Sequence, residues 1–164
     1  MTALTFNSNG HDCYFNMANK FWQDKSLNEL SINEWESLCD GCGKCCLQKL
    51  EDEDTGEVYY TQIACKLLNL QSCRCQDYLH RRSKVPGCIK LTIDNLKYFH
   101  WLPETCAYRL MAEGKPLPDW HPLVSGCVTS THKAGMSVKQ FVRSELDVPE
   151  SQWDNYIIPT LSVN

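Results

Sequence analysis

The sequence has no long apolar run, no excess of positive charge and no glycine-rich phosphate loop. No apolar stretch approaches the roughly 18 residues that a transmembrane helix needs, which excludes an integral membrane protein. The formal net charge is −4, and this balance argues against a module that binds the phosphate backbone of DNA or RNA. We therefore expect a globular protein without a membrane or nucleic-acid partner.

An export signal is also missing. The first twenty residues, MTALTFNSNGHDCYFNMANK, have no basic segment followed by an apolar one, so we expect a cytoplasmic protein. Cytosolic thiols are kept reduced, and a dense set of cysteines then indicates metal binding or catalysis rather than disulfides. The same stretch is polar and has no helical or strand period. We expect a loosely ordered leader over 1–20, followed by a single domain over 21–164.

A catalytic arrangement is not recognisable either. The five histidines are scattered, and no Ser/His/Asp or Cys/His set has a familiar local context. His121, within Trp120-His121-Pro122, is the best candidate for a ligand other than cysteine, although an ordinary core or surface role is the favoured interpretation. We do not expect the chain to be an enzyme by itself.

Cysteine, by contrast, is abundant. Of the eleven cysteines, nine fall between Cys39 and Cys106, and the run opens as Cys39-Asp-Gly-Cys42-Gly-Lys-Cys45-Cys46. Two cysteines separated by two residues can bind one ion at about 2.3 Å for Zn–S, and intervening glycines let the backbone turn tightly enough. Cys13 and Cys127 stand apart and are predicted not to bind metal. The predicted metal ligands are Cys39, Cys42, Cys45, Cys46, Cys65, Cys73, Cys75, Cys88 and Cys106.

The number of cysteines suits more than one kind of metal centre. A structural zinc ion takes four ligands, so nine cysteines suffice for two zinc ions, which is the favoured interpretation. Iron or a [4Fe–4S] cluster is the alternative, because such a cluster also takes four cysteines. In an extended backbone the adjacent Cys45 and Cys46 would point to opposite faces. The pair therefore predicts two metal sites or one polynuclear cluster.

Local patterns predict an α+β fold of short helices and one β-hairpin around the metal centre. Ser31 and Glu34 form a capping-box pattern, which indicates a short helix just before Cys39. Two short strands are predicted at 47–50 and 58–63, joined by the acidic loop 51–57. A calcium site in this loop is disfavoured, because the acidic residue that closes an EF-hand loop is absent.

The rest of the chain is predicted in less detail. The segment 65–88 is cysteine-rich and irregular. Thr92 can cap a helix over 93–99, and Pro103 suits the first turn of a helix that Gly114 would end. Prolines make 115–126 a stiff surface connection. The apolar spacing at Val138, Phe141, Val142 and Leu146 predicts a further helix.

The cysteine run resembles the signature of the bacterial CxxCxxCC family, which is described as zinc- or iron-chelating and is also called YkgJ-like. Longer stretches, such as EWESLCDGCGKCCLQKLEDEDTGEVYYTQIACKLLN, WLPETCAYRLMAEGK and LPDWHPL, are similar to the YcgN-type branch over roughly residues 21–126. The resemblance implies metal chelation by the cysteine cluster and little about mechanism.

Two details of this resemblance bear on the site. The family pattern of cysteine, tyrosine, Arg-Pro and cysteine matches Cys75, Tyr78, Arg81 and Cys88, but Arg82 replaces the proline and Cys88 comes about three residues late. Similar motifs occur in flagellin lysine methylases with an iron–sulfur cluster. By analogy, the alternative function is electron transfer or assistance to a protein-modifying enzyme.

Overall fold

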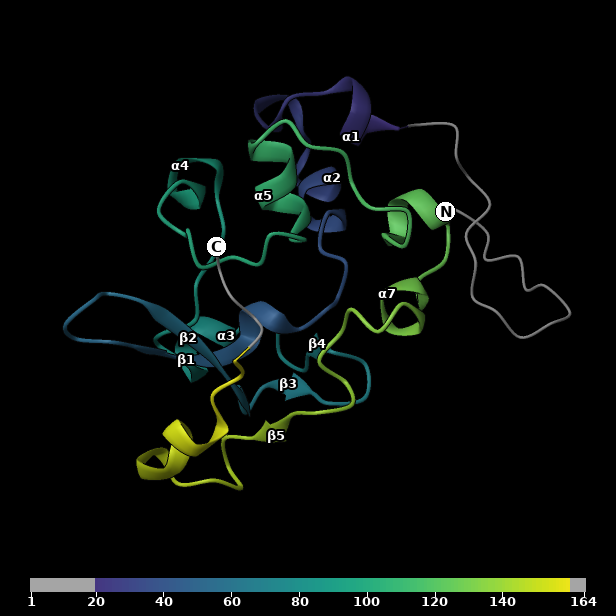
Figure 1. Cartoon of the computed structure of the whole chain (residues 1–164). Helices are drawn as coiled ribbons and strands as arrows, with labels where there is room; N and C mark the ends of the chain where they lie inside the picture. The colour runs from purple at the N-terminus through teal and green to yellow at the C-terminus, as the bar shows by residue number, and fades with distance from the viewer. Residues whose placement is uncertain (1–19, 160–164) are drawn as a thin grey trace, which may run out of the picture. The chain divides into compact units, whose positions relative to one another are not determined.

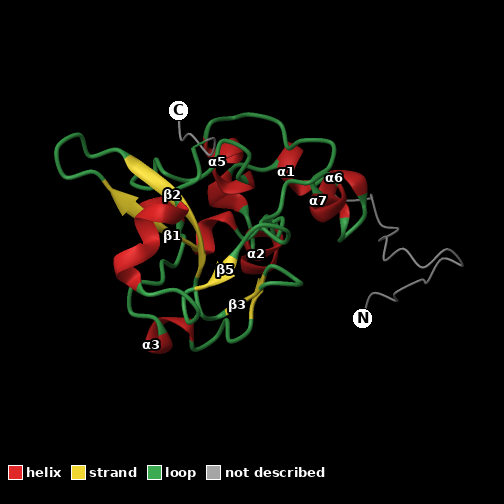
Figure 2. Cartoon of the chain, turned by 60° about the horizontal axis from the view of Figure 1, so that its bottom comes forward, coloured by secondary structure: helices red, strands yellow, loops and turns green. Residues whose placement is uncertain are grey.

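The computed structural model of the chain describes residues 20–159, which form two compact units. The first unit combines 20–40 with 104–136, and the second combines 41–103 with 137–159. The predicted leader, with Cys13, lies outside the described residues except for Lys20. Short helices and a few strands alternate with long connections (Figure 2), so the predicted α+β class is confirmed. Within residues 20–159, no helix combines the length and the apolar character that crossing a bilayer requires.

The first unit consists of short helices. Ser31 accepts a hydrogen bond from the Glu34 amide (3.3 Å), and the Glu34 carboxylate accepts one from the Ser31 amide (2.8 Å), which confirms the predicted capping box. The elements are α1 (Phe21–Asp24), η1 (Leu27–Glu29), α2 (Ile32–Ser37), α5 (Ala107–Ala112), α6 (Pro122–Ser125) and α7 (Ser130–Lys133).

Helices α2 and α5 lie side by side (Figure 1), with the Trp35 and Tyr108 rings 4.9 Å apart. The Tyr108 hydroxyl donates to the Trp35 carbonyl (3.0 Å), and the buried Thr131 hydroxyl donates to the Asp40 carbonyl (3.0 Å). Hydrogen bonds from buried side chains to main-chain carbonyls therefore join the two chain segments of this unit.

Two predictions for this unit need correction. The helix expected from Pro103 begins only at Ala107, because Cys106 adopts an extended conformation at its N-cap; it ends before Gly114, whose φ is +66°. The segment 115–126 is not a surface connection throughout. Leu117 and His121 are buried in it, and α6 starts at Pro122.

The second unit is built around a small sheet. Strands β1 (Leu47–Glu51) and β2 (Val58–Ala64) form the predicted antiparallel hairpin, and β5 (Arg143–Ser144) adds parallel to β2. The segment predicted to be irregular contains a second hairpin, β3 (Leu68–Asn69) and β4 (Arg74–Cys75). The remaining elements are η2 (Lys44–Cys46), α3 (Arg81–Lys84), α4 (Ile93–Leu96) and η3 (Glu150–Tyr156). Thr92 is the N-cap of α4 as predicted, but the helix ends at Leu96 rather than at Phe99, because the Tyr98 and Phe99 amides donate to carbonyls three residues back (3.0 and 3.1 Å).

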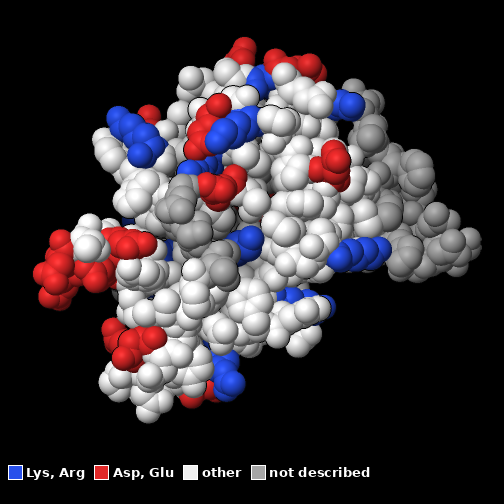
Figure 3. Space-filling view, in the orientation of Figure 1, with Lys and Arg blue, Asp and Glu red and all other residues white. Residues whose placement is uncertain are grey.

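The loop between β1 and β2 carries the acidic residues of 51–57, which gather at one place on the surface (Figure 3). The Asp52 carboxylate accepts hydrogen bonds from the Asp54 amide (3.0 Å) and from the amide and hydroxyl of Thr55 (2.8 and 2.9 Å). Gly56 closes the turn at a φ of +70°. Hydrogen bonds within the loop therefore stabilise its turn conformation.

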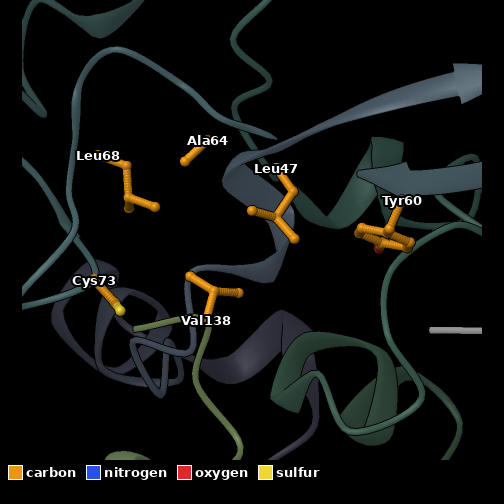
Figure 4. Close-up of a cluster of buried hydrophobic side chains, with 6 residues drawn as sticks. All are labelled: Leu47, Tyr60, Ala64, Leu68, Cys73 and Val138. Carbon is orange, nitrogen blue, oxygen red and sulfur yellow. The ribbon is translucent and has the colours of Figure 1, made fainter. Parts of the chain in front are cut away.

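The core of the second unit gathers side chains from the sheet, the second hairpin and the C-terminal segment (Figure 4). Val138 is fully buried there, and its amide donates to the Cys42 carbonyl (2.9 Å). This contact attaches the C-terminal segment to the cysteine turn. The core residues are Leu47, Tyr60, Ala64, Leu68, Cys73 and Val138.

The helix predicted over 138–146 is wrong. Val138 is buried, but Leu146 is 74% exposed, so the apolar residues do not form one buried face. The amide of Val138 bonds to Cys42 and that of Glu145 to the Ala64 carbonyl (2.9 Å), which leaves β5 in place of a helix. Backbone hydrogen bonds to distant carbonyls therefore replace the hydrogen bonds between residues four apart that a helix needs.

Candidate metal centre

The second unit carries seven of the nine predicted ligands. Cys39 and Cys106 belong to the first unit, where Cys39 is exposed after α2 and Cys106 is the N-cap of α5. None of the ten cysteines among residues 20–159 forms a disulfide. The cysteines of the second unit are Cys42, Cys45, Cys46, Cys65, Cys73, Cys75 and Cys88.

The cysteine turn depends on two glycines with left-handed backbone. Gly41 has a φ of +72° and Gly43 a φ of +77°. A Cβ on Gly43 would lie 2.8 Å from Cγ2 of Val138, and one on Gly41 would lie 2.9 Å from the Arg74 guanidinium. Backbone conformation and space therefore both require glycine here, which agrees with the tight turn expected between the cysteines.

Cys45 and Cys46 leave this turn in a 3₁₀ helix rather than in an extended chain. Their Sγ atoms lie 4.0 Å apart. Two thiolates bound to one tetrahedral ion at about 2.3 Å would be about 3.8 Å apart. The two adjacent thiols can therefore bind one ion. The prediction of two metal centres assumed an extended backbone at Cys45 and Cys46, which the structure does not have.

Main-chain hydrogen bonds bring further cysteines toward this pair. The Cys65 amide donates to the Cys46 carbonyl (2.9 Å), where the chain leaves β2. The Leu68 amide donates to the Cys65 carbonyl (2.8 Å), and Leu68 in β3 pairs with Cys75 in β4. The cysteine turn, the end of β2 and the second hairpin are therefore linked in one neighbourhood.

Burial and neighbouring cysteines both raise the pKa values of two thiols in this neighbourhood. Burial raises the pKa of the Cys65 thiol, and the thiols of Cys88 and Cys75 raise it further. Burial also raises the pKa of Cys88; Arg81 opposes this by its charge and a hydrogen bond, whereas Cys75 and Cys45 add to it. We call the interacting set the thiol cluster: Cys45, Cys46, Cys65, Cys75 and Cys88.

The thiol cluster fits a metal by its donor chemistry. Its thiolates are the soft ligands that zinc and iron take in cysteine sites. Within residues 20–159, however, no group of three or more His, Cys, Asp or Glu side chains is already arranged to hold an ion. Binding would have to draw the thiols together and displace their protons.

Cys73 has a different environment from its neighbour Cys75. It is buried among the core residues (Figure 4), and its φ is +52°, an unusual value for a residue other than glycine. Burial raises the pKa of its thiol, while hydrogen bonds from Ser137 and the Val138 amide act in the opposite direction. The chemistry of Cys73 is that of a buried core thiol.

Lys49 is a functional candidate that the sequence reasoning missed. Its ammonium donates to the main-chain carbonyls of Cys45 (3.0 Å) and Leu47 (2.8 Å). Burial lowers the pKa of Lys49, and the charges of Cys45 and Cys46 act in the opposite direction. No local sequence pattern marked it, because its environment depends on rings that are distant in sequence, those of Tyr60 and Trp101.

His121 is a core histidine of the first unit rather than a candidate ligand. It is fully buried, its Nε2 donates to the Leu38 carbonyl (3.0 Å), and its Nδ1 accepts from the Leu123 amide (3.1 Å). Main-chain groups therefore engage both ring nitrogens, and burial lowers the pKa of the ring.

Cys127 is also buried in this unit, and its Sγ lies 3.5 Å from the Thr129 hydroxyl. That Cys127 does not bind metal stays a prediction.

The fold and the thiol cluster together define a small α+β cysteine-cluster protein. The model of the CxxCxxCC family, described as "Putative zinc- or iron-chelating domain", matches residues 38–107. This range contains all nine predicted metal ligands, from Cys39 to Cys106. The chain belongs to the UPF0260 family, and it carries a match to the CxxCxxCC domain in residues 38–107.

The relatives that show this membership are bacterial. A UPF0260 protein of Marinobacter nauticus is 59% identical over 138 residues, which are 84% of this chain and 93% of the relative. A UPF0260 protein of Vibrio vulnificus is 52% identical over 87% of this chain and 97% of the relative. A UPF0260 protein of Azotobacter vinelandii is 56% identical over 84% of this chain and 93% of the relative. No solved structure matches the chain.

Proposed function

We propose that this chain is a metal-binding protein whose thiol cluster holds a zinc or iron ion. The observation that carries the proposal is the 4.0 Å between the Sγ atoms of Cys45 and Cys46, together with the main-chain hydrogen bond that ties Cys65 to Cys46. The second hairpin, which contains Cys75, adjoins Cys65 through Leu68. The zinc- or iron-chelating description of the matching family supports the same chemistry.

The geometry of the adjacent pair favours a single tetrahedral ion. The 4.0 Å between Sγ of Cys45 and Sγ of Cys46 is close to the separation of about 3.8 Å expected for two thiolates on one zinc. In a [4Fe–4S] cluster the four thiolates bind four different iron atoms, which separates them further. A mononuclear ion is therefore the first candidate, with zinc preferred over iron.

Five thiols exceed the four that a tetrahedral ion needs. One member of the thiol cluster is then a hydrogen-bonding neighbour of the ligands rather than a ligand. Cys39, Cys42 and Cys106 remain predicted ligands, and a second metal site remains part of the prediction. The role of Cys73 changes, since its buried environment supports a place in the core instead.

The proposal also includes a reducing compartment. Thiolates bind metal only while they are reduced, so we propose a cytoplasmic location. A protein that binds metal in this way without a catalytic arrangement would use the ion to organise its second unit. Exchange of the ion with a protein partner is compatible with the exposed position of Cys45.

Metal analysis of anaerobically purified protein tests the proposal. We expect about one equivalent or more of zinc or iron per chain. Single Cys46→Ser, Cys65→Ser, Cys75→Ser and Cys88→Ser variants should lose metal affinity in at least three of the four cases. Cys127→Ser is the matched control and should keep the wild-type metal content. A wild-type protein without zinc or iron, or four variants with unchanged affinity, would overturn the proposal.

A further inference from the structure

Lys49 lies on β1 with its ammonium between the cysteine turn and two aromatic rings. Nζ is 3.0 Å from the Cys45 carbonyl oxygen and 2.8 Å from that of Leu47. It also lies 5.0 Å from the centre of the Tyr60 ring and 4.3 Å from the centre of the Trp101 ring. Both distances are within the range of a cation–π interaction.

The rings that receive this ammonium are themselves held in place. Tyr60 is buried, and its hydroxyl donates to the Trp101 carbonyl. The Phe99 ring packs against the Trp101 ring at 5.4 Å. The ammonium of Lys49 therefore has a defined position, unlike the freely moving end of an ordinary surface lysine.

The position of this charge matters for a metal–thiolate centre. A divalent ion with four thiolate ligands has a net charge of −2, and a nearby cation offsets that charge where water is partly excluded. The Cys45 carbonyl bonded to Lys49 belongs to the same turn that brings Sγ of Cys45 within 4.0 Å of Sγ of Cys46. One side chain thus fixes the backbone of the turn and supplies positive charge beside its thiols.

We infer that Lys49 is a positioning residue of the thiol cluster: it holds the Cys45–Cys46 turn through the Cys45 and Leu47 carbonyls and stabilises the negative charge of the metal-bound thiolates. Lys49 binds no metal itself. The inference rests on the proposed function for its second part, because charge stabilisation requires a bound metal. Its first part, the holding of the turn, concerns the metal-free chain as well.

Three variants separate these effects. Lys49→Met removes the charge and the hydrogen bonds while keeping an unbranched side chain of similar length. Lys49→Arg keeps a cation that can stack on the two rings. Lys66→Met is the matched control, since Lys66 is exposed and follows Cys65 directly, so it removes the same charge from another position near the thiol cluster.

The first measurement is hydrogen exchange of the metal-free proteins at the amide of Cys46, which bonds to the Gly43 carbonyl (3.1 Å). We expect Lys49→Met to exchange roughly tenfold faster than wild type at this amide, because the turn opens more readily. Lys49→Arg should restore most of the protection, and Lys66→Met should exchange at the wild-type rate. Unchanged exchange in Lys49→Met would overturn the holding of the turn.

The second measurement is the zinc affinity, determined by competition with a chromophoric chelator. We expect Lys49→Met to bind zinc roughly tenfold or more weakly, Lys49→Arg within about threefold of wild type, and Lys66→Met within about twofold. Equal losses in Lys49→Met and Lys66→Met would overturn the specific role of Lys49. If wild type binds neither zinc nor ferrous iron in this assay, the proposed function fails and charge stabilisation fails with it, whereas the exchange measurement still decides whether Lys49 holds the turn.

Discussion

The two units of the chain differ in the chemistry of the side chains that link their segments. In the first unit, side chains such as His121, Thr131 and Tyr108 donate hydrogen bonds to main-chain carbonyls. In the second unit, the corresponding groups are the thiols of the thiol cluster, and burial and, to a smaller extent, nearby cysteines raise the pKa values of Cys65 and Cys88. A hydrogen-bonded core is complete without a ligand, whereas gathered thiols become favourable once a metal replaces their protons. The stability of the first unit should therefore depend on pH, and the stability of the second unit should depend on bound metal.

Removal of metal should give the largest difference between the units. The thiol cluster joins η2, β2, β4 and the turn after α3, so much of the binding free energy of the metal contributes to the stability of the second unit. After anaerobic chelation we expect amide exchange in β1 and β2 to accelerate by about 100-fold or more. Amides of α2 and α5 should change by less than about threefold. Mass spectrometry of peptides measures the exchange. Equal acceleration in both units would contradict the claim that metal stabilises the second unit alone.

Substitution of a glycine should give the next largest effect. Gly43→Ala forces a Cβ to 2.8 Å from Val138 and an unfavourable φ on alanine, so we expect a loss of about 2–4 kcal/mol in the free energy of unfolding. Gly135→Ala in the first unit is the control. Its φ is +70°, and an added Cβ would meet nothing within 4 Å, so the loss should be about 1 kcal/mol. Similar losses in urea titrations of the two variants would show that space around Gly43 is not limiting.

Separate replacement of Cys73 and Cys75 should distinguish a core thiol from a metal ligand within the second unit. Cys73→Ser places a hydroxyl in the apolar core, and we expect a loss of about 1–2 kcal/mol in stability with the metal content retained. Cys75→Ser should do the reverse: it should lower metal affinity and leave the metal-free stability within about 0.5 kcal/mol of wild type. Metal analysis and urea titration of both variants give the two readouts. Loss of metal from Cys73→Ser would return Cys73 to the ligand set.

The pH response of the first unit should be the smallest effect. Burial holds the pKa of His121 below its ordinary value of 6.5, so the unfolded chain binds this proton more readily than the folded one. Stability should be complete above pH 6.5 and fall, by on the order of 1 kcal/mol per pH unit at most, as the pH drops toward the folded pKa. Urea titrations between pH 7.5 and pH 5.5, which lie about one unit either side of that value, check this. His121→Asn should flatten the dependence, and an unchanged slope in this variant would contradict it.

Local chemistry made part of this fold predictable from sequence. The capping residues Ser31 and Thr92 mark helix starts because their side chains act on amides only three residues away. The β1–β2 hairpin followed from two β-prone segments on either side of an acidic loop that Asp52 and Gly56 organise. These elements depend on neighbours in sequence, which is why a single sequence is sufficient to find them.

Long-range contacts decide the features that the sequence reasoning missed. The helical spacing from Val138 to Leu146 was overridden because distant carbonyls of Cys42 and Ala64 take the amides of Val138 and Glu145. The difference between Cys73 and Cys75 depends on one left-handed residue. In a regular strand these two side chains would share a face, but the φ of +52° at Cys73 breaks the alternation and leaves its thiol in the core.

X-ray absorption of anaerobically purified protein at the zinc and iron edges counts the sulfur atoms around the metal and so tests whether the thiol cluster is the metal centre. We expect a first shell of about four sulfur atoms at about 2.3 Å. The Cys46→Ser variant should show fewer sulfur atoms or no metal, while Cys127→Ser should give the wild-type shell. A first shell composed of nitrogen and oxygen, or a protein without either metal, would contradict the assignment of the thiol cluster as a metal centre.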